Sequence, residues 1–393
     1  MSGFLFVVPP LTGHINPAVG VAARLTAHGH QVAWACADPA LVRRLAGADA
    51  VVFRCAGPVP GTPGAVRPPD LRGAEALRFL WEGYLLPLAD AMAPGVHAAV
   101  AGFRPDVVVA DQQAFAGALV AERLGLPWAT SATTSAEFGG AYDAMPKVAD
   151  WLRRRLAELR ARIGDPAGTA DPRSSPHLLL VFSTPELIGP RAPSAPHIHY
   201  VGPSLAGRPA GPDFPWERLD RGRAKVLVTL GTANADAGGR FLAETLAALR
   251  DRADRIQAVI TDPAGTLPAT ADDPDLLILP SVPQLPLLER MDAVVCHAGH
   301  NTVCEALWHG VPLVVAPIRD DQPVVAGQVV DAGAGVRVRF GRATAARLGE
   351  GLDTVLHDPA HRAAAARISA VFRTAGGAGA AAAHLARLAG ESR

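Results

Sequence analysis

The segment Cys296-His-Ala-Gly-His-Asn-Thr-Val-Cys-Glu-Ala-Leu-Trp-His-Gly310 decides the fold. It follows the end of the apolar run Ala293–Cys296 and continues as a helix pattern with apolar side chains on one face, closed by Gly310. A strand that passes through a glycine turn into a helix directs backbone N–H groups and the positive helix end at one point. The segment therefore predicts a strand–turn–helix unit that binds an anion such as a phosphate.

Three side chains of this segment indicate what else the ligand carries. His297 and Thr302 supply donors close to the expected anion, and Glu305 lies about one turn further along the helix. A carboxylate in that place can accept hydrogen bonds from vicinal hydroxyls. Donors for an anion at one end and an acceptor for hydroxyls at the other predict a sugar nucleotide.

Composition narrows the class of protein. The chain has 393 residues, enough for two domains, and its 49% hydrophobic but only 5% aromatic content predicts an aliphatic core. The 37 basic and 37 acidic residues cancel, which gives no reason to expect nucleic acid or an acidic membrane as partner. Its four cysteines lack Cys-x-x-Cys spacing, which favours a reducing, cytoplasmic compartment. The abundant Ala, Gly, Pro and Arg are typical of a bacterial chain from a GC-rich genome.

The first ten residues are apolar but carry no basic leader, and the apolar run is too short for a signal peptide or a membrane span. We expect a buried first strand there and no stable membrane insertion.

Short aliphatic runs alternate with helix patterns along the chain, which predicts parallel sheets covered on both faces. The expected strands are Phe4–Val8, Gln31–Cys36, Val51–Arg54, Asp106–Ala110, Trp128–Thr130, Leu178–Phe182, Val226–Leu230, Ile256–Ile260, Leu276–Leu279, Ala293–Cys296, Leu313–Ala316 and Val336–Arg339. The fold class is α/β, with two doubly wound parallel-sheet domains facing a cleft and ligands at the carboxyl ends of the strands.

The stretch Gly202–Gly222 is rich in Pro and Gly and lacks apolar periodicity, so it divides the chain. We expect an N-terminal domain over 1–205, a linker over 206–222, a C-terminal domain over 223–372 and a final helix over 373–393. Neither Gly-x-Gly-x-x-Gly nor a Walker sequence is present, which removes the main support for nicotinamide or P-loop chemistry.

The candidates for catalysis lie in the first half. After the first strand, Asn16 fits a helix N-cap and Pro17 the first helical position, so His14 should lie on a strand-to-helix loop. An imidazole there can take a proton near neutral pH, although a loop histidine by itself is more often a solvated or capping residue. Asp111 ends a strand and can orient such a base, or it can cap the next helix. Asp106, at the other end of that strand, is the weaker candidate.

The motifs His-Ala-Gly-x-Asn-Thr-x-x-Glu, Gly-Val-Pro and Asp321-Gln322, in this order and spacing, resemble the donor-binding signature of GT-B fold, nucleotide-sugar-dependent glycosyltransferases. The closest group is the one that decorates macrolides, other antibiotics and plant secondary metabolites. Gly-His-Ile-Asn-Pro, around His14, resembles the catalytic loop of the same family. The resemblance spans the chain but is specific only in these motifs, and it implies that the final helix crosses back to the N-terminal domain.

The resemblance also implies roles for individual residues. The diphosphate would lie at the first turn of the second half and at the helix start, the base and ribose at Ser281–Gln284 and Glu305, and the sugar at Asp321-Gln322. The donor-binding set is Thr232, Val282, Gln284, His297, Gly299, Asn301, Thr302, Glu305, Asp321 and Gln322. Ser281 stands where the family often has Trp, which leaves open what stacks on the base. A plain turn at Thr232 and a plain helix start at Asp321 are the alternatives.

The implied reaction is an inverting transfer by a hexosyltransferase. His14, oriented by Asp111, would deprotonate a hydroxyl that attacks the anomeric carbon of a dTDP- or UDP-linked sugar, with no cofactor and no metal. The acceptor would be a lipophilic natural product such as an antibiotic aglycone, held by the apolar, irregular stretches 71–100 and 135–156. Their aromatic side chains, which core packing explains equally well, are Phe79, Trp81, Tyr84, Phe138 and Tyr142.

Other functions stay open. A sugar-nucleotide epimerase of GT-B shape would bind the same donor, and a non-catalytic helper of a partner glycosyltransferase would keep the fold. A metal site at Cys296, His297, His300 and Cys304 lacks the paired short spacings of structural zinc. The sequence leaves undecided the sugar, the base, the acceptor, the need for a helper and whether the chain forms a homodimer.

Overall fold

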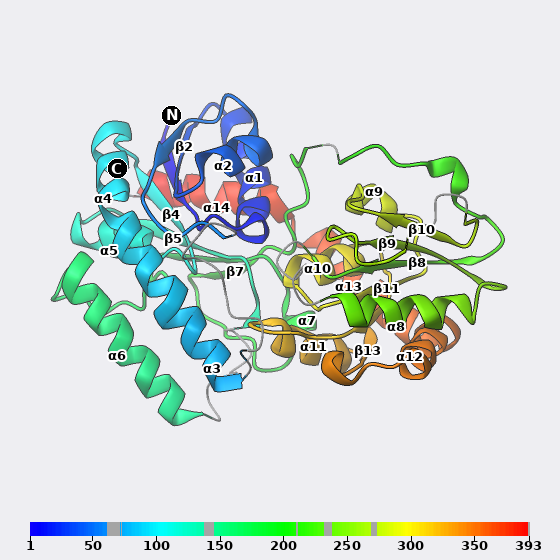
Figure 1. The fold of residues 1–393 in the computed structure, drawn as a ribbon. Helices are drawn as coiled ribbons and strands as arrows, with labels where there is room; N and C mark the ends of the chain where they lie inside the picture. Colours follow the sequence, from blue (N-terminus) through cyan, green and yellow to red (C-terminus); the bar gives the residue numbers. More distant parts are fainter. Residues whose placement is uncertain are drawn as a thin grey trace. The chain divides into compact units, whose positions relative to one another are not determined.

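The computed structural model describes residues 1–60, 71, 73–136, 145–209, 211–231, 238–268 and 273–391 of the chain. It divides into two compact units, each built on a parallel sheet with helices packed against it (Figure 1). Unit 1 consists of Met1–Thr184, Arg191–Pro209 and Ala375–Arg393, and unit 2 of Pro185–Pro190 and Ala210–Thr374. Two doubly wound parallel-sheet units confirm the expected α/β fold class.

The sheet of unit 1 has the strand order β3-β2-β1-β4-β5-β6-β7, and every neighbouring pair is parallel. The strands are β1 (Gly3–Val7), β2 (Gln31–Cys36), β3 (Val52–Arg54), β4 (Val107–Asp111), β5 (Trp128–Ala132), β6 (Leu178–Val181) and β7 (Ile198–Tyr200). Because β1 pairs with both β2 and β4, the strand order reverses there. In doubly wound sheets this reversal is where ligands bind, at the carboxyl ends of the strands.

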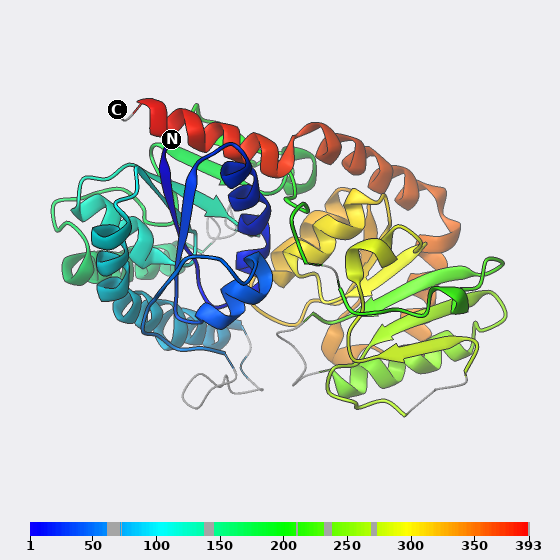
Figure 2. The same ribbon diagram turned by 90° about the horizontal axis from the view of Figure 1, so that it is seen from above.

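Helices cover both faces of this sheet. They are α1 (Thr12–Ala27), α2 (Pro39–Ala46), α3 (Gly73–Arg78), α4 (Leu86–Phe103), α5 (Phe115–Arg123), α6 (Pro146–Ile163) and α14 (Gly377–Glu391), with a π-helical turn η1 (Phe79–Leu85) between α3 and α4. Successive side chains of β1 alternate between faces, so Phe4 packs with α1 and α14 while Leu5 packs with α4 and α5. In Figure 2, α14 lies alongside α1. Gly20 on α1 permits close packing, because a Cβ there would lie 2.6 Å from the Ala206 carbonyl oxygen.

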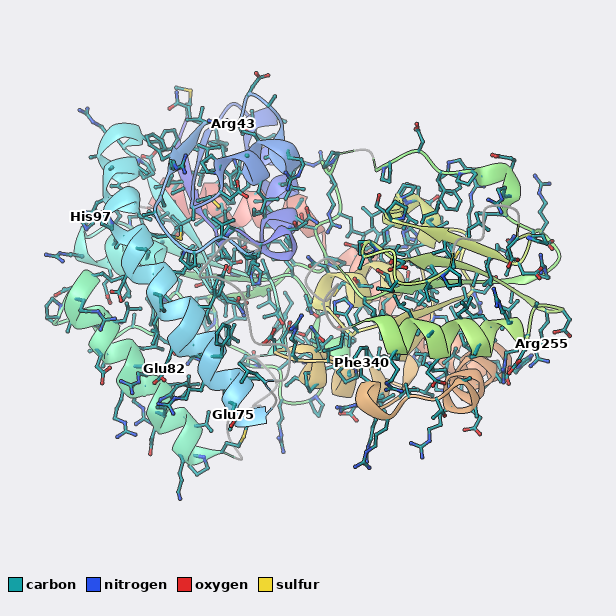
Figure 3. All side chains as sticks on the ribbon, viewed as in Figure 1. Arg43, Glu75, Glu82, His97, Arg255 and Phe340 are labelled. Carbon is teal, nitrogen blue, oxygen red and sulfur yellow. The ribbon has the colours of Figure 1, made fainter. Side chains whose placement is uncertain are left out.

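The continuous helical stretch Gly73–Phe103 is long and apolar enough to cross a membrane by length and composition. Buried core helices pass the same test, and here α4 packs against α5 and α6 within unit 1. Glu82, labelled in Figure 3, forms ion pairs with Arg78 at 2.7 Å and with Arg155 of α6 at 3.0 Å. This stretch therefore belongs to the packed body of unit 1.

The sheet of unit 2 has the order β10-β9-β8-β11-β12-β13, again parallel throughout, with the reversal between β8 and β11. Its strands are β8 (Ala224–Thr229), β9 (Ile256–Thr261), β10 (Leu276–Leu279), β11 (Ala293–Cys296), β12 (Leu313–Val315) and β13 (Gly335–Arg337). Its helices are α7 (Pro185–Ile188), α8 (Gly239–Arg250), α9 (Gln284–Leu288), α10 (His300–Trp308), α11 (Gln322–Asp331), α12 (Ala345–His357) and α13 (Pro359–Thr374), with 3-10 turns η3 (Trp216–Arg218) and η5 (Phe340–Arg342).

Every strand expected from the sequence is present, and the short strand β7 is an addition. The unit boundaries differ from the expected division in two places. Residues 185–190 belong to unit 2, because Leu187 of α7 is buried in the same core as Phe372 of α13. The expected linker 206–222 is anchored rather than loose, because Phe214 is buried in that core and Trp216 packs against it.

Candidate functional site

His14 lies in the first turn of α1, not on a loop before it. The helix begins at Thr12 with Leu11 at the N-cap, and the N–H groups of His14 and Ile15 both donate to the Leu11 carbonyl, at 3.0 and 3.1 Å. The expected start at Pro17 is therefore wrong. Pro17 is the sixth residue of α1 and cannot donate the helical hydrogen bond to Gly13, and the helix continues through it instead of opening at it.

The structure brings His14 and Asp111 together. Nδ1 of His14 lies 3.0 Å from Oδ1 and 3.1 Å from Oδ2 of Asp111, although 97 positions separate the two residues. They meet because β1 and β4 are neighbours, and both side chains extend from the carboxyl edge of the sheet. The His14 side chain keeps 16% of its surface exposed, whereas the Asp111 side chain is fully buried.

Asp111 is not the cap of the following helix. The N-cap of α5 is Ala114, and the Asp111 carboxylate instead accepts the Gln113 N–H at 2.8 Å. Asp106, the weaker candidate, accepts the Gly3 N–H at 2.7 Å at the opposite end of β4. Of these two carboxylates, the one beside His14 is Asp111.

Thr133 joins this pair, and sequence reasoning missed it. It follows β5, the strand next to β4, and its Oγ1 lies 2.8 Å from Oδ2 of Asp111 and 2.8 Å from Nδ1 of His14. Thr133 lies three residues beyond the expected strand Trp128–Thr130, whereas Asp111 directly follows the expected strand Asp106–Ala110, so the sequence signal for Thr133 was weaker. A hydroxyl there is unremarkable until strand order places it beside a histidine and a carboxylate.

The aromatic candidates for acceptor contact occupy different environments. Trp81 on η1 is 1% exposed and stacks on Phe115 with ring centroids 5.4 Å apart, which favours the core-packing alternative for this residue. Phe79 is half-buried. Tyr84 has a buried hydroxyl without a partner among the described residues. Burial, with the nearby Cys36 and Asp111, raises the pKa of Tyr84 above its ordinary value. Two further candidates, Phe138 and Tyr142, lie outside the described residues.

In unit 2 the loop between β11 and α10 has an unusual backbone. Ala298 adopts φ +64°, which non-glycine residues rarely do, and Gly299 forms the N-cap of α10 without a side-chain cap. A Cβ on Gly299 would lie 2.2 Å from Nε2 of His297, and one on Gly231 would lie 2.7 Å from its Cε1. Both glycines therefore admit the imidazole ring to the start of the helix.

His297 is 8% exposed, and its Nδ1 has no hydrogen-bond partner within the described ranges. Burial lowers the pKa of His297 to about 4, the Thr229 backbone opposes this shift, and the nearby positive charge of Arg319 adds to it. The ring is therefore neutral at physiological pH. A neutral imidazole at a helix N-terminus offers a polar group to an anion without adding a buried charge.

Several other expected donor-binding residues lie on α10 or, like Gln284, contact it. The Gln284 amide donates to Oε2 of Glu305 at 2.5 Å, and the Glu305 side chain is buried. Thr302 is also buried, Asn301 and Val282 are half-buried, and Ser281 is exposed. Thr232 lies outside the described residues, directly after Gly231. Gln284 of α9 and Glu305 of α10 thus form a hydrogen-bonded pair.

Asp321 and Gln322 mark the start of α11. Gln322 is buried, and its side-chain oxygen accepts the N–H groups of Ile318 and Arg319 at 2.9 and 3.1 Å. The two bonds occupy the amide oxygen of Gln322, so its NH₂ group is the part of the amide that could donate to a ligand. Asp321 is the N-cap of α11 without a side-chain cap bond. Asp321 therefore offers a hydrogen-bond acceptor, and the adjacent Gln322 offers a donor.

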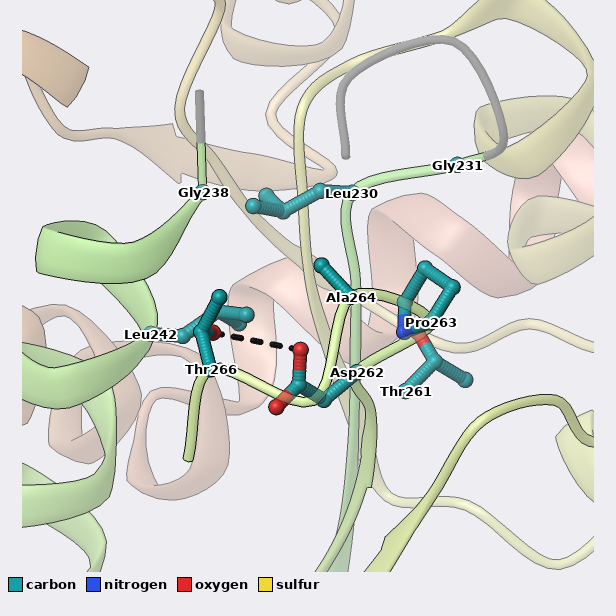
Figure 4. A pocket seen from close by; sticks show the side chains of 9 residues that line it. All are labelled: Leu230, Gly231, Gly238, Leu242, Thr261, Asp262, Pro263, Ala264 and Thr266. Atoms are coloured by element: carbon teal, nitrogen blue, oxygen red, sulfur yellow. Dashed lines mark hydrogen bonds between the residues drawn. The ribbon is translucent and has the colours of Figure 1, made fainter. Parts of the chain in front are cut away.

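A small pocket lies at the carboxyl ends of β8 and β9, beside the reversal of strand order. Figure 4 shows its lining, in which Thr266 donates to Asp262 at 3.2 Å. Gly231 is one of its lining residues, and a Cβ on Gly231 would lie 2.7 Å from Cε1 of His297. The pocket therefore adjoins the β11–α10 loop, and its Thr261, Asp262 and Thr266 side chains all form hydrogen bonds within unit 2.

The cysteines near this loop are buried thiols. Burial raises the pKa of Cys296 to about 12, which keeps its thiol protonated. Cys304 contacts Nε2 of His300 at 3.4 Å, one helical turn away on α10. Within the part of the chain that the structure describes, no group of three or more His, Cys, Asp or Glu side chains lies close enough together to hold a metal ion.

Comparison with known proteins relates the sequence of this chain to a family. Residues 244–375 match the family model described as erythromycin biosynthesis protein CIII-like, C-terminal domain. The 4'-demethylrebeccamycin synthase of Lentzea aerocolonigenes is 30% identical, over 93% of this chain and 94% of that protein. The demethyllactenocin mycarosyltransferase of Streptomyces fradiae is 30% identical, over 96% of this chain and 84% of that protein.

Solved structures agree with the sequence relatives. The glycotransferase of kitacinnamycin superimposes with a TM-score of 0.81 at 25% identity, covering 98% of both chains. The glycosyltransferase SnogD from Streptomyces nogalater gives a TM-score of 0.70 at 25% identity, covering 99% of both chains. These four matches each span more than nine-tenths of this chain, and they support sugar transfer to natural-product acceptors. This chain therefore belongs to the GT-B glycosyltransferases of the macrolide and antibiotic group, and it is an enzyme of that family.

Proposed function

We propose that this glycosyltransferase transfers a sugar from a nucleoside-diphosphate donor to a hydroxyl of a lipophilic natural product with inversion, and that His14 is the general base. The observation that carries the proposal is the contact of His14 Nδ1 with both oxygens of the buried Asp111 carboxylate. A carboxylate at Nδ1 stabilises the tautomer with the proton on that atom. Nε2 then holds the lone pair that a base requires.

In the proposed step, the acceptor O–H proton passes to Nε2 of His14 while the acceptor oxygen bonds to the anomeric carbon. The bond from that carbon to the diphosphate oxygen breaks on the opposite side, which inverts the configuration. The positive charge that forms on the imidazole is balanced by Asp111, as in other catalytic histidine–carboxylate pairs. Each group needed for acceptor activation thus comes from unit 1.

Unit 2 supplies the groups for the donor. The start of α10, with His297 and Thr302, faces the charge that grows on the departing diphosphate, and Gln284 with Glu305 is placed for ribose hydroxyls. We assign Asn301 and the turn at Thr232 to the diphosphate, Val282 to the base, and Asp321 with Gln322 to the transferred sugar. A helix end and neutral donors take the charge, so we propose that the reaction needs neither metal nor cofactor.

The base of the donor stays undecided between dTDP and UDP. Two proteins of the same fold, glycosyltransferase VinC and spinosyn rhamnosyltransferase SpnG, have structures described with thymidine diphosphate, and SpnG also has one with spinosyn aglycone. These make a dTDP-sugar and a lipophilic aglycone the first substrates to try. We place the reaction in the cytoplasm, with small molecules rather than nucleic acid as partners.

The test is an assay of the purified chain in chelator with dTDP- and UDP-sugars and a panel of aglycones that carry an unactivated hydroxyl. A glycoside whose anomeric configuration is opposite to that of the donor is the expected product. His14→Ala should lower turnover by about 10²–10⁴, the usual contribution of a general base. His28→Ala, which removes an exposed histidine at the other end of α1, is the matched control and should leave turnover unchanged.

The same assay separates the alternatives. An epimerase would convert the nucleotide sugar without any acceptor, and a helper would give product only with a partner transferase. Normal turnover by His14→Ala with an unactivated alcohol would refute the role of His14. Retention of configuration would refute the direct displacement.

A further inference from the structure

Thr133 makes a second set of contacts to the pair of His14 and Asp111. The residue is 3% exposed, and its Oγ1 lies 2.8 Å from Asp111 Oδ2 and 2.8 Å from His14 Nδ1. The two Asp111 oxygens lie 3.0 and 3.1 Å from the same nitrogen, so the hydroxyl oxygen is its nearest neighbour of the three. Three polar groups from three different segments thus form a closed triangle.

Counting protons gives one consistent assignment of this triangle. A threonine hydroxyl has one proton and two lone pairs, and an ionised carboxylate only accepts. If the Thr133 proton goes to Asp111, the Thr133 oxygen faces Nδ1 as an acceptor, and Nδ1 must carry the proton. In the reverse assignment Thr133 would donate to Nδ1, and two carboxylate oxygens would face an imidazole lone pair about 3 Å away. The first assignment satisfies every group, whereas the second sets acceptor against acceptor.

We propose that Thr133 is a positioning residue for His14, an inference that rests on the proposed role of His14 as the general base. The hydroxyl holds the Asp111 carboxylate in place and accepts a second branch of the Nδ1–H bond, which fixes the plane of the imidazole and directs Nε2 at the acceptor. Thr133 has a β-branched side chain with restricted rotation, and it follows β5 immediately. On this strand Ser131 is the register partner of Asp111, so the position of the hydroxyl is set by the sheet itself.

The variant that isolates the hydroxyl is Thr133→Val, which keeps the branched shape and removes the O–H. Thr133→Ser is its matched control, because it keeps the O–H and loses a methyl group. For an unactivated alcohol we expect Thr133→Val to lower kcat about tenfold, the effect of one lost hydrogen bond, with the KM of the nucleotide sugar unchanged. Thr133→Ser should recover most of this loss.

A second acceptor separates positioning from a general loss of structure. A strongly acidic phenol is largely ionised without help, so it needs the base far less than an alcohol does. Thr133→Val should therefore be nearly as active as the unmodified enzyme with the phenol, while remaining impaired with the alcohol. A partly unfolded protein would lose activity with both acceptors in equal measure, so the ratio of the two losses reports on the hydroxyl alone.

His14→Ala, measured beside these variants, keeps the two proposals distinct. If His14→Ala is as active as the unmodified enzyme, the proposed base is wrong and Thr133 has nothing to position. If His14→Ala is impaired but Thr133→Val is not, the positioning role is wrong and the base stands. Equal losses for Thr133→Val and Thr133→Ser, or equal losses with alcohol and phenol, would also overturn the inference, because shape rather than the hydroxyl would then be responsible.

Discussion

The buried imidazole of His297 makes the stability of unit 2 depend on pH. Burial lowers the pKa of His297 from 6.5 to about 4 in the folded protein, while the unfolded chain keeps the ordinary value. Between pH 6.5 and about 4, His297 is protonated in the unfolded chain but not in the folded protein. The folded state therefore loses stability as the pH falls from 6.5 to about 4, and no further below that.

The size of this loss follows from the same two values. One pKa unit corresponds to about 1.4 kcal/mol, so the full depression is worth about 3 kcal/mol, of which roughly 2 kcal/mol is lost between pH 7 and pH 5. The perturbation is His297→Gln, which removes the titration but keeps a polar side chain. The free energy of unfolding in urea should fall less for His297→Gln between these two pH values, by about 2 kcal/mol relative to the unmodified protein.

His357→Gln is the control, because His357 is exposed on α12 of the same unit. It should preserve the full pH dependence. The reasoning is refuted if His297→Gln loses as much stability as the unmodified protein between pH 7 and pH 5. Such a result would mean that the folded imidazole is protonated as easily as the free one, and the proposed diphosphate site would then contain a charged rather than a neutral ring.

Three further outcomes are expected. Because the members of a catalytic pair act as a unit, the double variant His14→Ala/Asp111→Asn should be little slower than His14→Ala alone, and multiplied losses in steady-state kinetics would speak for separate roles. Glu305→Ala should weaken nucleoside diphosphate binding by roughly 1–3 kcal/mol, whereas unchanged affinity in calorimetry would make Glu305 only a helix residue. Gly299→Ala should weaken the same binding at least about tenfold, because its Cβ would lie 2.2 Å from Nε2 of His297. Gly327→Ala is the control and should bind normally, because a Cβ there meets no atom within 4 Å. Equal binding by both glycine variants would contradict the packing argument.

The strands of this fold could be predicted because parallel sheets covered on both faces require continuous apolar runs. The runs Phe4–Val8 and Leu313–Ala316 each became a buried strand. The strand β7 was missed because it has three residues at the sheet edge, with His199 at its centre. An edge strand needs no such run, so its sequence carries little signal.

Helix starts and unit boundaries were harder to predict. Pro17 fits the first position of a helix, yet the backbone bonds to Leu11 had already started the turn. The segment 206–222 has the composition of a linker, but its aromatic residues Phe214 and Trp216 pack in the core of unit 2. Likewise, the π-helical turn η1 breaks the 3.6-residue period, so spacing could not tell that Trp81 enters the core.

The site itself shows where sequence reasoning ends. His14 and Asp111 could be named because their motif resembles a family loop and because each follows or ends a strand. Thr133 carried no motif, and only the parallel register of β4 and β5 places its hydroxyl within 2.8 Å of both. Contacts across strands are fixed by strand order, which is a property of the whole sheet rather than of any one segment.

The surroundings of the two histidines in the proposals have opposite effects on the charge of the imidazole ring. Each follows one of the strands that flank the reversal of strand order in its unit, His14 after β1 and His297 after β11. His14 has a buried carboxylate and a hydroxyl at Nδ1, an environment that accepts the positive charge a base acquires. His297 is enclosed by two glycines and a helix start, where burial keeps the ring neutral and a positive charge would be costly. A ring that must gain a proton during the reaction needs the first environment. A ring that binds a diphosphate and later releases it works better in the second, because a fixed charge would hold the product.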